Sequence, residues 1–226
     1  VALAAAGVGV AVLAVVPWTI RNQLAFHTFV PVSTNIGTAL EGANCRPVYS
    51  GPAIGLWRSN FTLSPSSPDA CFTGFDIRLP HFNEARVAAA HRDRGLRYAR
   101  HHAGRLPAVF VTRFLRTWGL FRPHQQINEA ALEGRPVRWE IIGARMYWVL
   151  LVLAVGGFVV GVRRRRNTWP LLATMVMVSL STLATYGNQR FRAGAEPAIV
   201  ILAAAGLVTA VTAIRRRLVA VAASPG

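Results

Sequence analysis

Three apolar runs near the C-terminal end constrain this chain more than any other feature. A cluster of arginines follows the first run and another follows the third. Residues 141–162 contain Arg145 as their only charged residue, and residues 169–186 and 197–214 contain none. A helix rises about 1.5 Å per residue, so runs of this length extend roughly 27 to 33 Å, against about 30 Å for the hydrocarbon core of a bilayer. Each run is therefore predicted to be a transmembrane helix.

The arginine clusters predict the direction of these helices. Residues 163–168 begin with four consecutive arginines, and residues 215–226 begin with three. Positively charged short loops stay on the cytoplasmic side of a membrane. We therefore predict a cytoplasmic loop at 163–168, a cytoplasmic tail at 215–226 and an outer loop at 187–196.

Residues 1–20 form a fourth apolar run. The run has no basic segment before it and no cleavage signature, which argues against a signal peptide. We predict a transmembrane helix that enters from the cytoplasm, in a chain that begins inside a larger protein. Residues 21–140 are then predicted to lie outside the cytoplasm. Their arginines do not contradict this placement, because long loops cross membranes largely regardless of charge.

Composition supports this class of protein. Hydrophobic residues make up 53% of the chain and charged residues only 15%, which is low for a soluble domain. The net charge of +16 comes with 25 basic residues that are all arginine, but seven of these belong to the two clusters that topology explains. The sequence therefore predicts an all-α polytopic protein of the cell membrane, in contact with the lipid bilayer and not with nucleic acid. It would have about four transmembrane helices and a mainly helical, partly irregular extracytoplasmic domain.

The predicted outer domain contains both cysteines of the chain. Cys45 and Cys71 lie on the oxidising side in this topology, so we predict a disulfide between them; two unpaired thiols are the alternative. Residues 29–80 are rich in glycine and proline and are predicted to be irregular, with room only for short strands or turns.

Two amphipathic helices are predicted after this stretch, at residues 83–103 and 107–121. Asn83 is the expected N-cap of the first. In the second, aromatic residues recur at helical spacing with Arg113 and Arg116 between them, a pattern typical of a helix in the membrane interface. The alternative is a helix packed on the core of the outer domain. The aromatic residues are Phe110, Phe114, Trp118 and Phe121.

Arginines at the predicted outer ends of the helices suggest a binding site. Arg21 follows the first run, and Arg190 and Arg192 lie in the outer loop at 187–196. Guanidinium groups bind phosphate bidentately, and this pairing is stronger in a low dielectric. These three residues suit the phosphate of a lipid-linked substrate. The alternative is that they pair with bulk lipid phosphates, or with Glu196 and Glu41.

Other catalytic and metal-binding patterns are missing from the sequence. The six histidines show no ligand spacing with a cysteine or carboxylate, so they are expected to be solvated or interfacial, and no metal site is predicted. The chain contains no glycine-rich phosphate loop and no nucleophile elbow.

Several short segments resemble glycosyltransferase family 39, the GT-C-type membrane enzymes that include protein O-mannosyltransferases and aminoarabinose transferases. The segments are PWTIRN at 17–22, FVPVSTN at 29–35, GTALEGAN at 37–44, YARHHAGR at 98–105 and YGNQRFR at 186–192, with Glu196 and Pro197 after the last. The paired cysteines and the exclusive use of arginine resemble the actinobacterial branch. The resemblance extends over most of the chain, which would correspond to the C-terminal part of such an enzyme.

The resemblance implies transfer of a sugar from a polyprenyl-phosphate carrier to an acceptor on the outer face. In this family a carboxylate near the N-terminus of the whole enzyme acts as the base and often helps to hold a divalent metal. No catalytic residue and no cofactor are therefore assigned within this chain. Its expected contribution is a site for the lipid phosphate, formed by Arg21, Asn22, Asn188, Arg190, Arg192 and Glu196.

Two other functions fit the same sequence. One is a non-enzymatic envelope protein whose outer domain binds a partner or a polysaccharide. The other is a transporter or ligase of lipid-linked sugars, which would use the same arginines. The sugar and the acceptor are not indicated by any of these residues.

Overall fold

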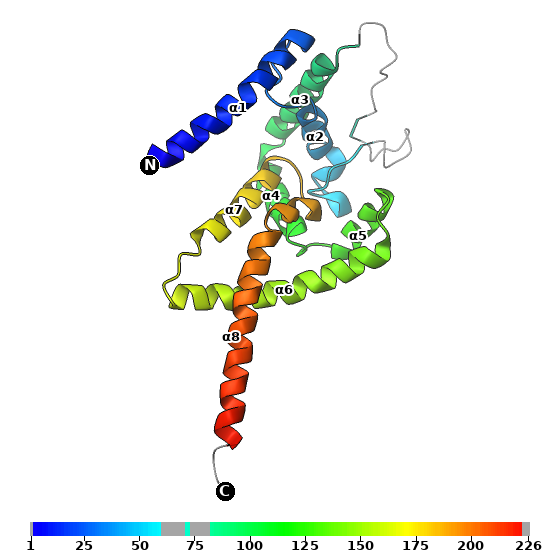
Figure 1. The fold of residues 1–226 in the computed structure, drawn as a ribbon. Helices are drawn as coiled ribbons and strands as arrows, with labels where there is room; N and C mark the ends of the chain where they lie inside the picture. Colours follow the sequence, from blue (N-terminus) through cyan, green and yellow to red (C-terminus); the bar gives the residue numbers. More distant parts are fainter. Residues whose placement is uncertain (1, 60–70, 73–81, 223–226) are drawn as a thin grey trace. The chain divides into compact units, whose positions relative to one another are not determined.

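The computed structural model describes residues 2–59, 71–72 and 82–222, and over these residues the chain forms α-helices and short 3₁₀-helices without a strand (Figure 1). The all-helical class predicted from the sequence is confirmed for this part of the chain. The helices group into two compact units, Val1–Phe110 and Val111–Gly226. Residues 60–70 and 73–81 lie outside the described residues, and with them much of the stretch 29–80 that was predicted to be irregular.

Helix α1, Ala2–Phe26, is apolar and exposed along most of its length. Val8, Leu13 and Leu24 are each about two-thirds exposed, at 66%, 69% and 70%. A helix that is apolar on all sides and uncovered by its own protein is typical of a membrane span. Pro17 lies inside the helix, which continues to Phe26 rather than ending at residue 20 as predicted.

Side-chain hydrogen bonds hold the last turns of α1 against the segment that follows. The indole Nε1 of Trp18 donates to the Val32 carbonyl at 2.8 Å, and the Thr19 hydroxyl donates to the Pro31 carbonyl at 2.7 Å. The buried Asn22 donates its side-chain amide to the Val30 carbonyl at 3.2 Å. These contacts explain why the helix extends past the predicted boundary.

Helices α2, Ile36–Ala43, and α3, Glu84–His101, pack closely in the first unit. Asn83 caps α3 as predicted, because its side chain accepts a hydrogen bond from the Arg86 backbone amide at 3.1 Å. A methyl group on Gly95 would lie 2.6 Å from the Leu40 carbonyl oxygen, and one on Gly37 would collide with the Ala88 carbonyl. The prediction that 29–80 holds only strands and turns is therefore wrong at α2, whose glycines permit close packing of helices rather than breaking one.

The core of the first unit forms around the disulfide. Cys45 and Cys71 are bonded, with their Cα atoms 5.5 Å apart, so the predicted disulfide is confirmed. The bridge packs with Val48, Tyr49 and Val109, which are almost fully buried. Two short 3₁₀-helices, η1 (Arg46–Val48) and η2 (Gly51–Ala53), carry the chain between these contacts, and a third, η3 (Ala103–Arg105), follows α3.

The second unit is built on two long helices that cross, α6 and α8 (Figure 1). At the crossing, Gly157 and Gly206 bring the two backbones together, since a methyl group on Gly157 would lie 2.9 Å from the Gly206 nitrogen. Small residues such as Ala154 and Ala203 are buried on the same surfaces. The elements are α4 (Leu106–Thr117), which begins in the first unit, α5 (Pro123–Leu132), α6 (Val137–Arg163), α7 (Trp169–Ala184), η4 (Gln189–Gly194) and α8 (Glu196–Ala222).

Within the part of the chain that the structure describes, three helices are long and apolar enough to cross a membrane: Ala5–Phe26, Val137–Arg163 and Glu196–Val219. They correspond to three of the four predicted spans. The fourth, predicted at 169–186, is the shorter helix α7 of 16 residues, which extends about 24 Å. That length is below the thickness of the hydrocarbon core, so α7 does not meet the length expected of a span.

Candidate functional site

A cleft of about 630 Å³ opens in the second unit where η4 leads into α8. Its walls come from α6, η4 and the first turn of α8, and they combine charged side chains with apolar ones. Trp139, Met146 and Val200 line the apolar part and are exposed by 64%, 60% and 50%. A cleft of this composition can accept a ligand that carries both an anionic group and a hydrocarbon chain.

Arg192 is the most buried charged residue of this cleft, with 7% of its surface exposed. Its guanidinium carbon lies 3.5 Å from the centre of the Tyr147 ring, in a cation–π contact with a phenol side chain from α6. Its Nε donates to Glu196 one helical turn later, at 3.4 Å. The guanidinium is therefore held between an aromatic face and a carboxylate at a fixed place in the cleft.

Local structure in η4 explains how Arg190 and Arg192 are presented. The Asn188 side chain accepts a hydrogen bond from the Arg190 backbone amide at 2.9 Å and caps the 3₁₀-helix. The chain then enters α8 with Glu196 in its first turn, where a carboxylate is favoured by the helix dipole. The two arginines thus lie in a single capped 3₁₀-helix, η4, immediately before α8.

The other arginines of the cleft also contact carboxylates. Arg190 Nη1 lies 3.0 Å from Glu133 Oε2, and Arg135 Nη1 lies 3.2 Å from Glu140 Oε1. The sequence left open whether Arg21, Arg190 and Arg192 bind a substrate phosphate or pair with bulk lipid phosphates, Glu196 or Glu41. In the structure Arg192 pairs with Glu196, whereas the partner of Arg190 is Glu133, which was not among those considered. Each of these pairs joins a carboxylate to one guanidinium nitrogen, and a guanidinium has five N–H donors.

The six residues predicted for the lipid phosphate divide between the two units. Arg190, Arg192 and Glu196 line the cleft of the second unit, and Asn188 lines a small neighbouring hollow together with Arg190. Arg21 and Asn22 belong to the first unit.

The contacts of Arg21 and Asn22 are local to α1. Arg21 stacks over the Trp18 ring at 5.0 Å and donates to the Asn22 side-chain oxygen at 3.3 Å. Asn22 is buried, and its amide binds the Val30 carbonyl, so in this structure it anchors the end of α1.

Helix α4 turns its arginines inward. Arg113 and Arg116 are 1% and 0% exposed, whereas Phe110 and Phe114 are 36% and 38% exposed. Arg113 donates to the Leu183 carbonyl at 2.9 Å and Arg116 donates to the Gln125 side chain at 3.1 Å. A helix lying in the membrane interface would hold these charges on its exposed side. Here both arginines face the protein, and Arg113 binds α7 rather than the core of the outer domain that the alternative named.

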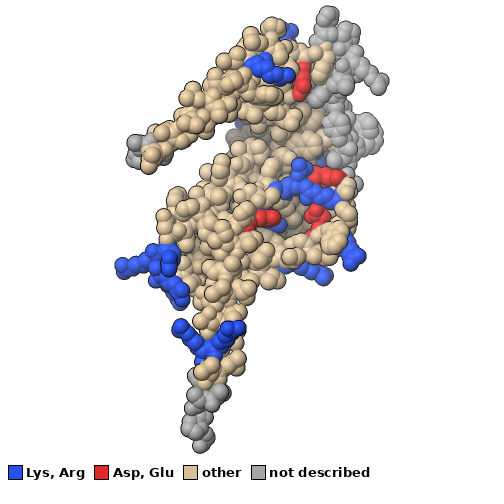
Figure 2. Space-filling model, in the orientation of Figure 1, with Lys and Arg blue, Asp and Glu red and all other residues tan. Residues whose placement is uncertain are grey.

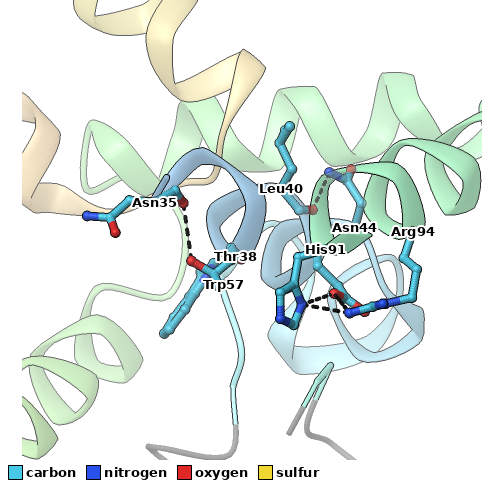
Figure 3. A network of polar contacts seen from close by, with 8 residues as sticks. Asn35, Thr38, Leu40, Asn44, Trp57, His91 and Arg94 are labelled. Atoms are coloured by element: carbon cyan, nitrogen blue, oxygen red, sulfur yellow. Dashed lines mark hydrogen bonds and ion pairs between the residues drawn. The ribbon is translucent and has the colours of Figure 1, made fainter. Parts of the chain in front are cut away.

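A polar network in the first unit was not predicted (Figure 3). Glu41 of α2 is buried, and Arg94 of α3 binds it bidentately, with Nε to Oε1 at 2.8 Å and Nη2 to Oε2 at 3.0 Å. The buried His91 contacts the same carboxylate through Nδ1, so the expectation of solvated or interfacial histidines is wrong at this residue. The hydrogen bonds that Arg94 donates to the Glu41 carboxylate raise the pKa of Arg94. The signal available in the sequence was the spacing of His91 and Arg94, which places both on one face of a helix.

The network joins helices α2 and α3. His91 also packs edge-on against Phe72, with ring centres 5.1 Å apart. Among the described residues, no group of three or more histidine, cysteine or acidic side chains is positioned to hold a metal ion. We therefore take the cleft in the second unit as the candidate functional site.

Comparison of the chain with protein-family models, with curated proteins and with solved structures finds no match. The cleft and its side chains are thus the structural observations that bear on function.

Proposed function

We propose that this chain is the C-terminal part of a membrane glycosyltransferase that moves a sugar from a polyprenyl-phosphate carrier to an acceptor on the outer face of the cell membrane. The observation that supports the proposal is the meeting of Arg190, Arg192 and Glu196 in one cleft. These residues were selected from the sequence for the same role.

The composition of the cleft fits a lipid phosphate better than a small soluble anion. Trp139 and Met146 provide an exposed apolar surface beside the charged groups. A polyprenyl chain would cover this surface while the phosphate meets the arginines. A free sugar phosphate would leave the same apolar surface in contact with water.

Arg192 is the residue that we assign to the leaving group. When the sugar departs, negative charge builds up on the carrier phosphate, and a fixed cation at that place stabilises the transition state more than the ground state. Contact with Tyr147 and Glu196 holds the guanidinium in position before the reaction, so little reorganisation is needed. Arg190 would add a second fork once the phosphate competes with Glu133.

The test measures transfer of radiolabelled sugar from polyprenyl phosphate by the full-length protein. Replacing Arg192 by Gln removes a charge-assisted contact, so kcat/KM is expected to fall about 10- to 100-fold. The variant Arg192→Lys keeps the charge but loses the planar fork, and it should recover only part of the activity. Arg145→Gln is the control, because it removes the same charge from an exposed residue of α6 that does not line the cleft.

Three outcomes would contradict the proposal. Equal activity of wild type and both Arg192 variants would show that the cleft does not hold the phosphate. Label that only crosses the bilayer would indicate a transporter, and absence of any transfer or transport would favour a non-enzymatic envelope protein. Thermal unfolding of each variant, measured beside activity, separates loss of the site from loss of the fold.

A further inference from the structure

A second groove, of about 480 Å³, lies in the second unit toward the C-terminal ends of α6 and α8. It is lined by Arg164 from the end of α6 and by Val208, Thr209, Thr212, Ala213 and Arg216 of α8. None of these residues was assigned a role beyond membrane topology.

The turn after α6 fixes the backbone that carries Arg164. Arg166 N–H donates to the Gly161 carbonyl at 2.9 Å and Arg165 N–H donates to the Val162 carbonyl at 3.0 Å, while Arg165 adopts a left-handed conformation with φ of 53°. These are the bonds of a Schellman motif, which ends a helix in a defined geometry and satisfies its last carbonyls. The basic side chains that follow α6 therefore start from an ordered turn.

The groove is strongly electropositive. Seven arginines lie at 163–166 and 215–217, and Glu196 is the only acidic residue from position 141 to the end of the sequence. No ion pair among the described residues involves any of the seven. Figure 2 shows basic surface near the ends of α6 and α8 with uncharged surface between them. The charge of these residues is thus not neutralised by carboxylates of this part of the chain.

The remaining wall of the groove offers acceptors and apolar surface. The Thr209 hydroxyl donates to the Ala205 carbonyl at 2.9 Å, and the Thr212 hydroxyl donates to the Val208 carbonyl at 2.7 Å. Because each hydroxyl hydrogen is used within α8, the oxygens can act toward a ligand only as acceptors. Val211 and Ile214 beside the groove are exposed by 41% and 57%.

We propose that this groove binds an anionic phospholipid with a hydroxylated headgroup, of the phosphatidylglycerol class. Arg164 and Arg216 bind the phosphate diester, the headgroup hydroxyls donate to Thr209 and Thr212, and the acyl chains cover the apolar surface of α8. Basic pockets between transmembrane helices on the cytoplasmic side bind lipid headgroups in this way. The proposal rests on placement of α6 and α8 in a membrane and does not depend on sugar transfer.

The test compares two pairs of substitutions with equal loss of charge. In Arg164→Gln with Arg216→Gln both groove arginines are removed, and in Arg163→Gln with Arg217→Gln two neighbours outside the groove are removed. Phosphatidylglycerol is titrated into the delipidated full-length protein in detergent, and bound lipid is measured by native mass spectrometry. The apparent Kd is expected to rise about tenfold or more in the groove pair, which corresponds to about 1.4 kcal/mol, and to change less than about twofold in the control pair.

Further ligands define what would overturn the proposal. Phosphatidylcholine should bind at least about tenfold more weakly than phosphatidylglycerol, and millimolar inorganic phosphate should not displace the lipid. An equal loss of affinity in both pairs would show diffuse attraction by the arginine clusters instead of a site. Displacement by inorganic phosphate would show a simple anion site, and equal binding of phosphatidylcholine would show binding without selection for charge.

Discussion

Substitution of Gly157 by alanine should loosen the crossing of α6 and α8. Its added methyl group would lie 2.8 Å from the Leu202 carbonyl carbon, 2.9 Å from the Gly206 nitrogen and closer still to the Leu202 oxygen. Ordinary contacts of this kind begin near 3.4 Å. Because all three atoms belong to the backbone of α8, no side chain can turn aside, and the helices must move apart.

The magnitude follows from two opposing effects. Alanine is favoured over glycine in a helix by about 1 kcal/mol, which would stabilise the variant. Separation of a tightly packed contact typically costs about 1 to 3 kcal/mol, and the requirement for backbone movement places this case near the upper end. The net expectation is a loss of about 1 to 2 kcal/mol in the free energy of unfolding.

Gly156 is a matched control next in the chain. It is exposed, and a methyl group there would meet nothing within 4 Å. Gly156→Ala should therefore raise the midpoint of thermal unfolding of the purified protein in detergent, whereas Gly157→Ala should lower it. Equal midpoints for the two variants, or a higher midpoint for Gly157→Ala, would refute the close crossing of these helices.

Three further predictions concern the first unit. Glu41→Gln leaves Arg94 without its carboxylate partner and should lower the free energy of unfolding by about 1 to 3 kcal/mol, after allowance for the partial exposure of Arg94. The control Asp93→Asn, at an exposed ion pair, should lower it by less than about 0.5 kcal/mol. Chemical denaturation of both variants measures the difference. Burial raises the pKa of Tyr98, so the stabilising contribution of the neutral Tyr98 side chain is present below about pH 10 and is lost as pH rises through the folded pKa. Tyr98→Phe should remove this part of the pH dependence of thermal unfolding. An unchanged pH profile in this variant would contradict the prediction. After mild reduction of intact cells, a membrane-impermeant maleimide should label Cys45 and Cys71, and labelling only after lysis would reverse the predicted orientation.

The features predicted correctly from the sequence are those for which the residue pattern allows few alternative structures. A run of apolar residues long enough to span a bilayer leaves little choice but a buried or lipid-covered helix, so α1, α6 and α8 could be located. The pairing of Cys45 with Cys71 followed from their being the only two cysteines. The start of α3 was found because an N-cap is a local signal.

The features that were missed depend on contacts between distant residues. Gly37 and Gly42 count as helix breakers when the sequence is considered locally, but in α2 Gly37 faces the backbone of α3 and Gly42 faces the Trp57 ring. Helix α7 ends at Ala184, and the nearby Leu183 carbonyl accepts a hydrogen bond from Arg113, which is 70 residues away. Charges such as Arg113 and Arg116 are read as surface residues because burial of arginine requires partners that local patterns do not reveal.

The candidate cleft could be predicted only in part, because some of its residues stand out locally and others depend on contacts between distant residues. Arginines in a short loop between apolar runs are unusual, and this drew attention to Arg190 and Arg192. The carboxylates that pair with Arg190 and Arg135 were not anticipated. Neither was the Tyr147 ring under Arg192, since it comes from a different helix.

The bridge between Cys45 and Cys71 has a practical consequence for anyone who handles the protein. The two half-cystines are separated by 26 positions in the chain. Proteolysis at one peptide bond between them would leave both fragments covalently attached, so a nicked sample would migrate as a single band in a denaturing gel run without thiol. Adding dithiothreitol to the loading buffer would release an amino-terminal fragment carrying α1 and α2, and only then would the damage become visible.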